Sequence, residues 1–125
     1  MRILVCGGRN FNDRDLLYNT LYDVVPYHEP DEYGNTLPKG VTIISGMARG
    51  ADMMAYDWAV VNWCEVAEYP ANWDKHGKAA GPIRNQQMLD EGKPDLVIAF
   101  KGGNGTIDMV RRSKKAGIET RLIGW

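Results

Sequence analysis

The chain has 125 residues and a mass of 14.0 kDa, which is enough for one domain with a core of its own. Hydrophobic residues make up 44% and charged residues 25%, and this composition excludes a wholly disordered chain. The formal net charge of -1 excludes a global positive field that would hold nucleic acid or an anionic membrane without sequence preference.

Buried-strand patterns alternate with helical patterns along the whole chain. The predicted strands cover residues 3–6, 41–45, 66–69, 95–100 and 120–123. The predicted helices start at Asn12 or Asp13, after the turn at 46–52, at Gly81-Pro82 and at a Thr106 cap, and they end at Pro26, Trp63, Gly92 and Gly117. In the second helix, Met54, Trp58 and Val61 are expected to share one face.

This alternation predicts an α/β fold, a Rossmann-like three-layer sandwich. Right-handed crossovers place the five strands in one mostly parallel sheet with helices on both faces. We expect residues 1–125 to form a single domain, with 26–40 as a surface insertion because it combines prolines with a cluster of acidic residues. Residues 70–80 are expected to form a loop.

Glycines gather at the ends of three predicted strands. In a parallel α/β sheet a ligand binds outside the carboxyl ends of the strands. Each of these turns also leads into a helix N-terminus, whose free N–H groups and partial positive charge favour phosphate. The candidate ligand-binding residues at the three turns are Gly7, Gly8, Arg9, Ser45, Gly46, Arg49, Gly50, Asp52, Gly102, Gly103, Asn104, Gly105 and Thr106.

Charged side chains near these turns are further candidates. Arg9, Arg49 and Arg84 could clamp a phosphate, although Arg9 and Arg49 could equally lie on the surface or hold a loop. Arg84 is favoured for a ligand because a cation in the first turn of its helix opposes the helix dipole. Asp52 and Asp108 are also expected in first turns, where each either compensates the dipole or contacts the sugar of a ligand.

Two groups of aromatic residues leave alternatives open. Trp73 could stack on a base or pack its loop onto the domain. Tyr56, Trp58 and Trp63 could support a homodimer, and core packing explains them equally well.

Several familiar motifs are missing from the sequence. It has neither the G-x-x-x-x-G-K-[ST] of P-loop NTPases nor a G-x-G-x-x-G after the first strand, and no cofactor is expected. Cys6 and Cys64 lack metal-ligand spacing and cannot form a disulfide framework, so we expect no metal and a reducing compartment. No apolar stretch fits a signal peptide or a membrane span, and we expect a cytoplasmic protein without membrane contact.

The chain resembles the SLOG superfamily, which is named for the Smf/DprA and LOG proteins. Four segments carry the resemblance: GGRNFND (7–13), SGMARGAD (45–52), HGKAAGPIRNQQM (76–88) and KGGNGTIDMV (101–110). The match looks closest to the small YspA-like, YpsA-related branch found in bacteria and phages, and it covers nearly the whole chain except 26–40. It implies a Rossmann-like fold and the binding of nucleotides or related ligands.

The LOG members of this superfamily are phosphoribohydrolases, and their motifs are matched here in part. The resemblance aligns Arg84 with the Arg of an R-K motif, with Asn85 in place of the Lys. It aligns the phosphate turn of P-G-G-x-G-T-x-x-E with Gly102, Gly103, Gly105 and Thr106. Met109 stands at the position of the catalytic Glu and Asp108 lies one residue earlier, so Arg84 and Asp108 are the catalytic candidates.

Three functions follow from these patterns. The first is a sensor or sequestering module that binds a nucleotide or nucleotide-derived phosphate ligand at the carboxyl ends of the strands. The second is a nucleoside monophosphate phosphoribohydrolase, an N-glycosidase similar to the LOG enzymes. The third is DprA-like DNA binding, against which the near-neutral charge argues. The expected partner is therefore a nucleotide or sugar-phosphate small molecule, and neither nucleic acid nor a membrane.

Overall fold

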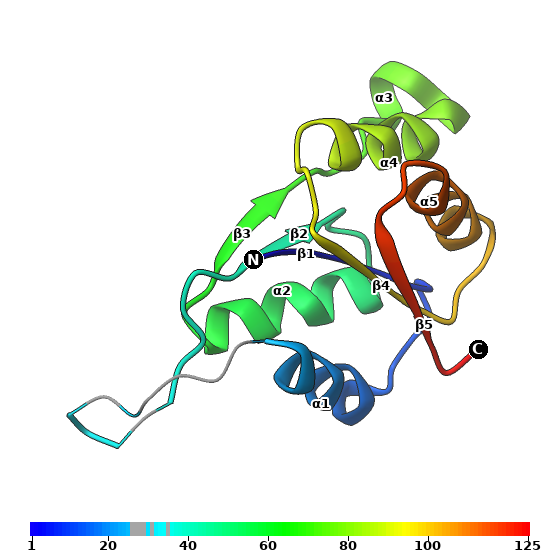
Figure 1. Cartoon of the computed structure of the whole chain (residues 1–125). Coiled ribbons are helices and arrows are strands. Elements are labelled where there is room, and N and C mark those ends of the chain that lie inside the picture. The colour runs from blue at the N-terminus through cyan, green and yellow to red at the C-terminus, as the bar shows by residue number, and fades with distance from the viewer. Residues whose placement is uncertain (26–29, 31, 35) are drawn as a thin grey trace.

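The computed structural model describes residues 1–25, 30, 32–34 and 36–125 of the chain. Five strands form one fully parallel sheet in the order β3-β2-β1-β4-β5. They are β1 (Arg2–Cys6), β2 (Thr42–Ser45), β3 (Glu65–Glu68), β4 (Leu96–Phe100) and β5 (Glu119–Ile123). The connecting helices are α1 (Arg14–Val24), α2 (Ala51–Val61), α3 (Trp73–His76), the 3₁₀-helix η1 (Gly77–Ala79), α4 (Ala80–Asp90) and α5 (Asn104–Lys115). The predicted α/β Rossmann-like fold is confirmed (Figure 1).

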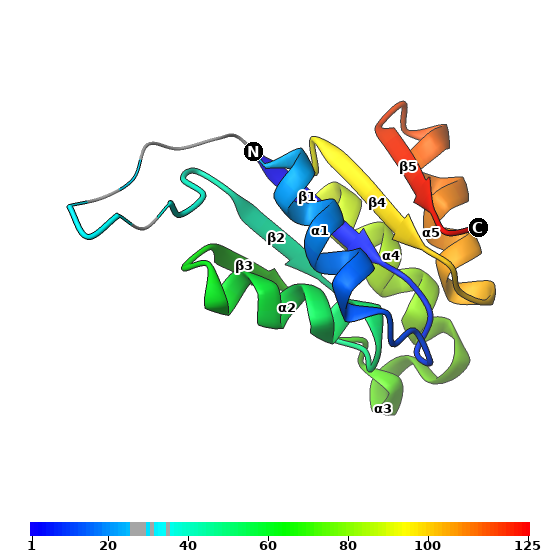
Figure 2. The same ribbon diagram turned by 90° about the horizontal axis from the view of Figure 1, so that it is seen from below.

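Helices α1 and α2 cover one face of the sheet, and α4 and α5 cover the other (Figure 2). Because successive residues of a strand point to opposite faces, Ile3 and Val5 pack in the core under α1 and α2. Leu4 and Cys6 pack in the second core, under α4 and α5. This two-sided burial explains why the central strands are continuous apolar runs in the sequence.

The strand order reverses between β1 and β4. The chain passes outward from β1 through β2 to β3, and then crosses back to place β4 on the other side of β1. The carboxyl ends of β1 and β4 therefore flank the point at which an open α/β sheet leaves a crevice.

Helix α1 begins where the sequence predicts it, and α2 ends earlier. The carboxylate of Asp13 accepts a hydrogen bond from the Leu16 amide at 3.1 Å and caps α1. The predicted apolar face of α2 is wrong at Val61, which is 60% exposed. The buried stripe runs through Ala51, Ala55, Trp58 and Ala59, and Val61 in the last turn lies to one side of it.

On the side of the sheet that α4 and α5 cover, one predicted loop and two predicted helix starts are wrong. Part of the expected 70–80 loop is helical as α3, because the Asn72 side chain caps it by accepting from the Lys75 amide at 3.1 Å. Helix α4 already starts at Ala80. Helix α5 starts at Asn104 with Gly103 as its N-cap, so Thr106 lies inside the first turn and does not cap it.

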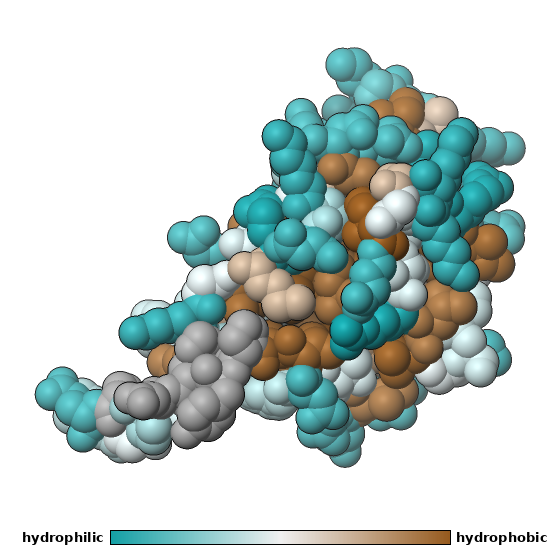
Figure 3. All heavy atoms as spheres, in the orientation of Figure 1, coloured by the Kyte–Doolittle hydropathy of each residue, from teal (hydrophilic) through white to brown (hydrophobic). Residues whose placement is uncertain are grey.

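The expected surface insertion lies partly outside the described residues. Positions 26–29, 31 and 35 are not described, and the described residues between 30 and 40 are exposed or partly exposed. Elsewhere the face in Figure 3 is largely hydrophilic over α3, α4 and α5. No helix of the described chain is both long enough and apolar enough to cross a bilayer.

Aromatic side chains of the proposed homodimer face do not share one surface. Trp58 is fully buried and packs edge-on against Tyr22 with ring centroids 5.5 Å apart. Trp58 is therefore a core residue and not part of a dimer surface. Trp63, in contrast, is 83% exposed.

Gly50 allows the turn after β2 to lie directly against the turn after β1. Its φ of +89° falls in the left-handed region that favours glycine. A Cβ at this position would overlap the carbonyl oxygen of Gly8, which accepts a hydrogen bond from the Ala51 amide at 3.3 Å. The close approach of the two turns therefore requires glycine.

We expect Gly50→Ala to lower the free energy of unfolding by about 2–4 kcal/mol, through backbone strain and overpacking. Gly103→Ala is the matched control because Gly103 has a φ of -93° and open space around its Cβ position. The control should cost less than about 1 kcal/mol in urea unfolding. Equal unfolding midpoints for the two variants would contradict this account of the turns.

Candidate functional site

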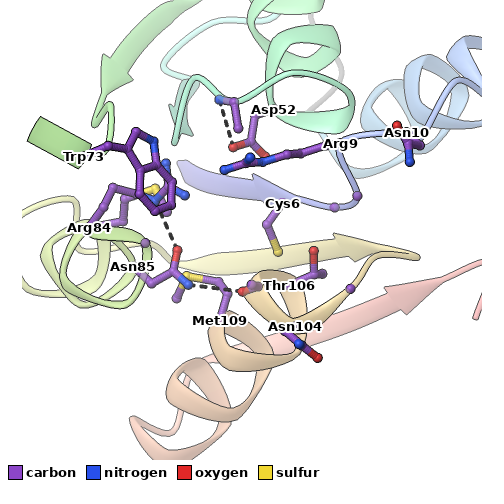
Figure 4. A pocket seen from close by; sticks show the side chains of 17 residues that line it. Cys6, Arg9, Asn10, Asp52, Trp73, Arg84, Asn85, Asn104, Thr106 and Met109 are labelled. Carbon is purple, nitrogen blue, oxygen red and sulfur yellow. Dashed lines mark hydrogen bonds between the residues drawn. The ribbon is translucent and has the colours of Figure 1, made fainter. Parts of the chain in front are cut away.

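The three glycine-rich turns meet at a single pocket at the carboxyl ends of β1, β2 and β4 (Figure 4). The pocket has a volume of about 350 Å³, which falls in the range of small-molecule sites. Its lining residues are Cys6, Gly7, Gly8, Arg9, Asn10, Ala48, Asp52, Trp73, Gly81, Arg84, Asn85, Met88, Gly103, Asn104, Gly105, Thr106 and Met109. The helices α2 and α5 both point their N-termini at this edge of the sheet.

The turn after β1 is held by its neighbours through tight backbone packing. The Gly8 amide donates to the Lys101 carbonyl at 3.1 Å, across the turn after β4. A Cβ at Gly7 would lie 2.6 Å from the Cβ of Ala51, at the start of α2. Gly7 and Gly8 thus line the pocket and also fix the spacing of its walls.

The turn after β2 places only some of its predicted residues at the pocket. Ser45 is fully buried, and its hydroxyl donates to the Asp52 carbonyl at 3.0 Å and accepts from the Met47 amide at 3.1 Å. Gly46 and Arg49 line an adjoining hollow. Arg49 donates to the Arg9 carbonyl at 3.2 Å, so it holds the two turns together.

The turn after β4 opens the N-terminus of α5 onto the pocket. Gly102 is closed in, because a Cβ there would overlap the Thr106 side chain and lie 2.6 Å from the Gly8 amide nitrogen. Gly103 and Gly105, by contrast, have open space where a Cβ would stand. The first amides of a helix have no acceptor within the helix. The amides of Asn104, Gly105 and Thr106 therefore point outward from the N-terminal end of α5.

Arg84 reaches the pocket from the second turn of α4, and not from the first turn as expected. Its Nη1 donates to the Gly46 carbonyl at 2.6 Å, and its Nε donates to Oδ1 of Asn85 at 3.2 Å. Burial lowers the pKa of Arg84, and the nearby Asp52 opposes this effect. Within the described chain Nη2 donates no hydrogen bond to a protein acceptor, which leaves it available for a ligand.

Asp52 lies in the first turn of α2, and its side chain faces the pocket although the residue is only 6% exposed. Its Oδ2 accepts from the Ala48 amide at 3.3 Å. Burial raises the pKa of Asp52 to about 6, against the opposing effects of Arg84 and Arg9. The pocket therefore contains a carboxylate whose charged form is disfavoured by burial, but which is still mostly ionised at neutral pH.

Asp108 lies in the second turn of α5, not in the first, and it does not line this pocket. Its carboxylate pairs with Arg111 at 2.7 Å and Arg112 at 2.8 Å, and it accepts from the Asn85 amide nitrogen at 3.0 Å. Burial would raise the pKa of Asp108, but the hydrogen bonds from Arg112 and Asn85 hold it below its usual value. Fully buried Met109 faces the pocket instead.

Cys6 and Met88 line the pocket although the sequence did not predict them there, and Trp73, whose role the sequence left open, lines it too. Trp73, on α3, is half exposed at the rim, and the Arg9 guanidinium lies 5.4 Å from the centre of its ring. Cys6, at the end of the predicted strand 3–6, packs in the core and also lines the pocket, and burial raises the pKa of its thiol. The hydrophobic wall is completed by Met88 from α4. No three His, Cys, Asp or Glu side chains of the described residues lie together in a way that could hold a metal ion.

Comparison with known proteins identifies a matching family model and a similar phage protein. The sequence model of the YAcAr family, described as the YspA, cpYpsA-related SLOG family, matches residues 1–76, which include the turns after β1 and β2. The Gene 61 protein of Mycobacterium phage D29 is 34% identical over 133 residues. That alignment covers 98% of this chain and 96% of the phage protein.

The raised pKa of Asp52 predicts how stability depends on pH. The folded chain holds this proton up to about pH 6, whereas the unfolded chain releases it near pH 3.8. The unfolding free energy of the wild type should therefore fall, relative to that of Asp52→Asn, by about 3 kcal/mol as the pH rises between these values. The asparagine keeps an acceptor for the Ala48 amide. Urea unfolding at several pH values measures the difference, and parallel curves for the two proteins would contradict the prediction.

Proposed function

This chain belongs to the YspA, cpYpsA-related SLOG family, and on that premise we propose that its pocket binds a nucleotide or nucleotide-derived phosphate ligand as a sensor or sequestering module. The sequence motifs already point to this family. Membership of it indicates the binding of a nucleotide-related ligand. One observation carries the proposal for this chain: the first turn of α5 opens onto the same pocket as Arg9 and Arg84.

A phosphate suits the groups that remain free around the pocket. The amides at the start of α5 have no acceptor within the helix, and this helix end favours a negatively charged group. Nη2 of Arg84 is free to donate to a ligand in the same pocket. Arg9 adds a second guanidinium, which the Trp73 ring supports from one side. The open space beside Gly103 and Gly105 allows a ligand to approach the backbone closely.

Binding without hydrolysis is favoured by the surroundings of Asp108 and Met109. Two arginines and Asn85 already occupy the carboxylate of Asp108, so it has little acceptor capacity for water or for a sugar cation. The thioether of Met109 cannot act as a base at the position that faces the pocket. The LOG-like phosphoribohydrolase alternative therefore lacks its carboxylate at the place that the resemblance implies.

We expect Gly103→Val to reduce the affinity for ribonucleoside 5′-monophosphates by about tenfold or more, because its side chain fills space that a phosphate would use. Ala116→Val, at the exposed other end of α5, is the control and should bind as the wild type does. Isothermal titration calorimetry with the four monophosphates and inorganic phosphate measures the effect, and circular dichroism checks folding. A folded Gly103→Val protein with unchanged affinity would remove α5 from the binding site.

Incubation of the protein with ribonucleoside 5′-monophosphates should leave them intact, as measured by chromatography of the free base. This result is expected because no carboxylate other than Asp52 lines the pocket in the described structure. Release of base by the wild type that is lost in Arg84→Ala would instead establish a hydrolase.

A further inference from the structure

Asp52 is a buried carboxylate that the described protein satisfies only in part. Its Oδ2 accepts one long hydrogen bond, from the Ala48 amide, and the residue forms no ion pair with another described residue. The neighbouring Arg84 directs Nη1 and Nε to other acceptors, Gly46 and Asn85. A carboxylate can accept about four hydrogen bonds, so most of the acceptor capacity of Asp52 is left for a group inside the pocket.

Stability alone does not explain a carboxylate at this position. An aspartate in the first turn compensates the helix dipole equally well when it is exposed to water. An asparagine would accept from the Ala48 amide without burying a charge. Another explanation is therefore needed for a charged side chain that faces the pocket in a residue that is only 6% exposed.

The surroundings of Asp52 select a neutral hydrogen-bond donor as its partner. Arg9 and Arg84 are both close enough to lower its pKa, so a cationic group would enter a region that already has two positive side chains. A metal ion would need further ligands, and no suitable group of three lies among the described residues. A hydroxyl group fits, because it can donate a charge-assisted hydrogen bond to the free oxygen.

The placement of Asp52 relative to α5 indicates in which part of a ligand this hydroxyl would lie. Figure 4 shows Asp52 and Arg9 on one side of the pocket and Thr106 and Asn104 on the other, with Cys6 between them. With a phosphate at α5, the sugar attached to that phosphate would extend toward Asp52. We infer, on the basis of the proposed function, that Asp52 accepts a hydrogen bond from the ribose 2′-hydroxyl, and that the site selects ribose 5-phosphate groups over 2-deoxyribose 5-phosphate groups.

Paired ligands that differ in one hydroxyl test this inference. Isothermal titration calorimetry would compare ribose 5-phosphate with 2-deoxyribose 5-phosphate. It would also compare adenosine 5′-monophosphate with 2′-deoxyadenosine 5′-monophosphate. The wild type should prefer the ribose member of each pair by about tenfold or more, as expected for a hydrogen bond to a charged group. In Asp52→Asn the preference should fall to about threefold or less. Asp57→Asn changes a carboxylate on the same helix that pairs with Arg14 outside the pocket, and it should keep the full preference.

The outcomes separate this inference from the proposed function. If phosphate ligands bind and Gly103→Val abolishes their binding, but the wild type binds both members of each pair equally, the role of Asp52 is overturned and the proposed function stands. The same conclusion follows if Asp52→Asn keeps the preference of the wild type. If none of the four compounds binds, both the proposed function and the inference fail. The comparison of ligands on the wild type requires no variant to fold.

Discussion

The peptide groups around Gly8 hold the pocket together. The Gly8 amide donates to the end of β4 through Lys101, and its carbonyl accepts from Ala51 at the start of α2. These contacts bring three turns within hydrogen-bonding distance of one another, and they leave no room for a Cβ at Gly7 or Gly50. The glycines of this edge therefore have two roles. Some allow the turns to approach one another, whereas Gly103 leaves space open for a ligand.

The charges of the pocket are arranged at some cost to the folded chain. Arg84 and Asp52 are both buried enough for their pKa values to move toward the neutral forms. Arg84 also donates to the Gly46 carbonyl, so its charge is tied to the end of β2. A ligand that carries a phosphate and a hydroxyl would satisfy the groups that the protein leaves free. Groups that are disfavoured in the fold but complementary to a ligand are typical of functional sites.

Most of the fold and part of the site could be predicted from the sequence. Alternating strands and helices define the sheet, and the rule for carboxyl ends of strands predicts that the turns meet. The inward position of Ser45 was also predictable, because Ile43 faces α1 and α2 and side chains alternate along a strand. Arg111 and Arg112 stand three and four residues after Asp108, a spacing that forms helix ion pairs. The place of Trp73 was not predictable, because it depends on how the short helix α3 packs.

An NMR titration would show whether the three turns bind one ligand together, because it reports on every turn of the pocket in one experiment. Adenosine 5′-monophosphate would be added to ¹⁵N-labelled protein while the backbone amide signals are followed. We expect the largest shifts at the amides of Gly8, Arg9, Asn104, Gly105 and Thr106, with little change at the C-terminal end of α5. Saturable shifts confined to another surface, or no shifts at millimolar ligand, would contradict it.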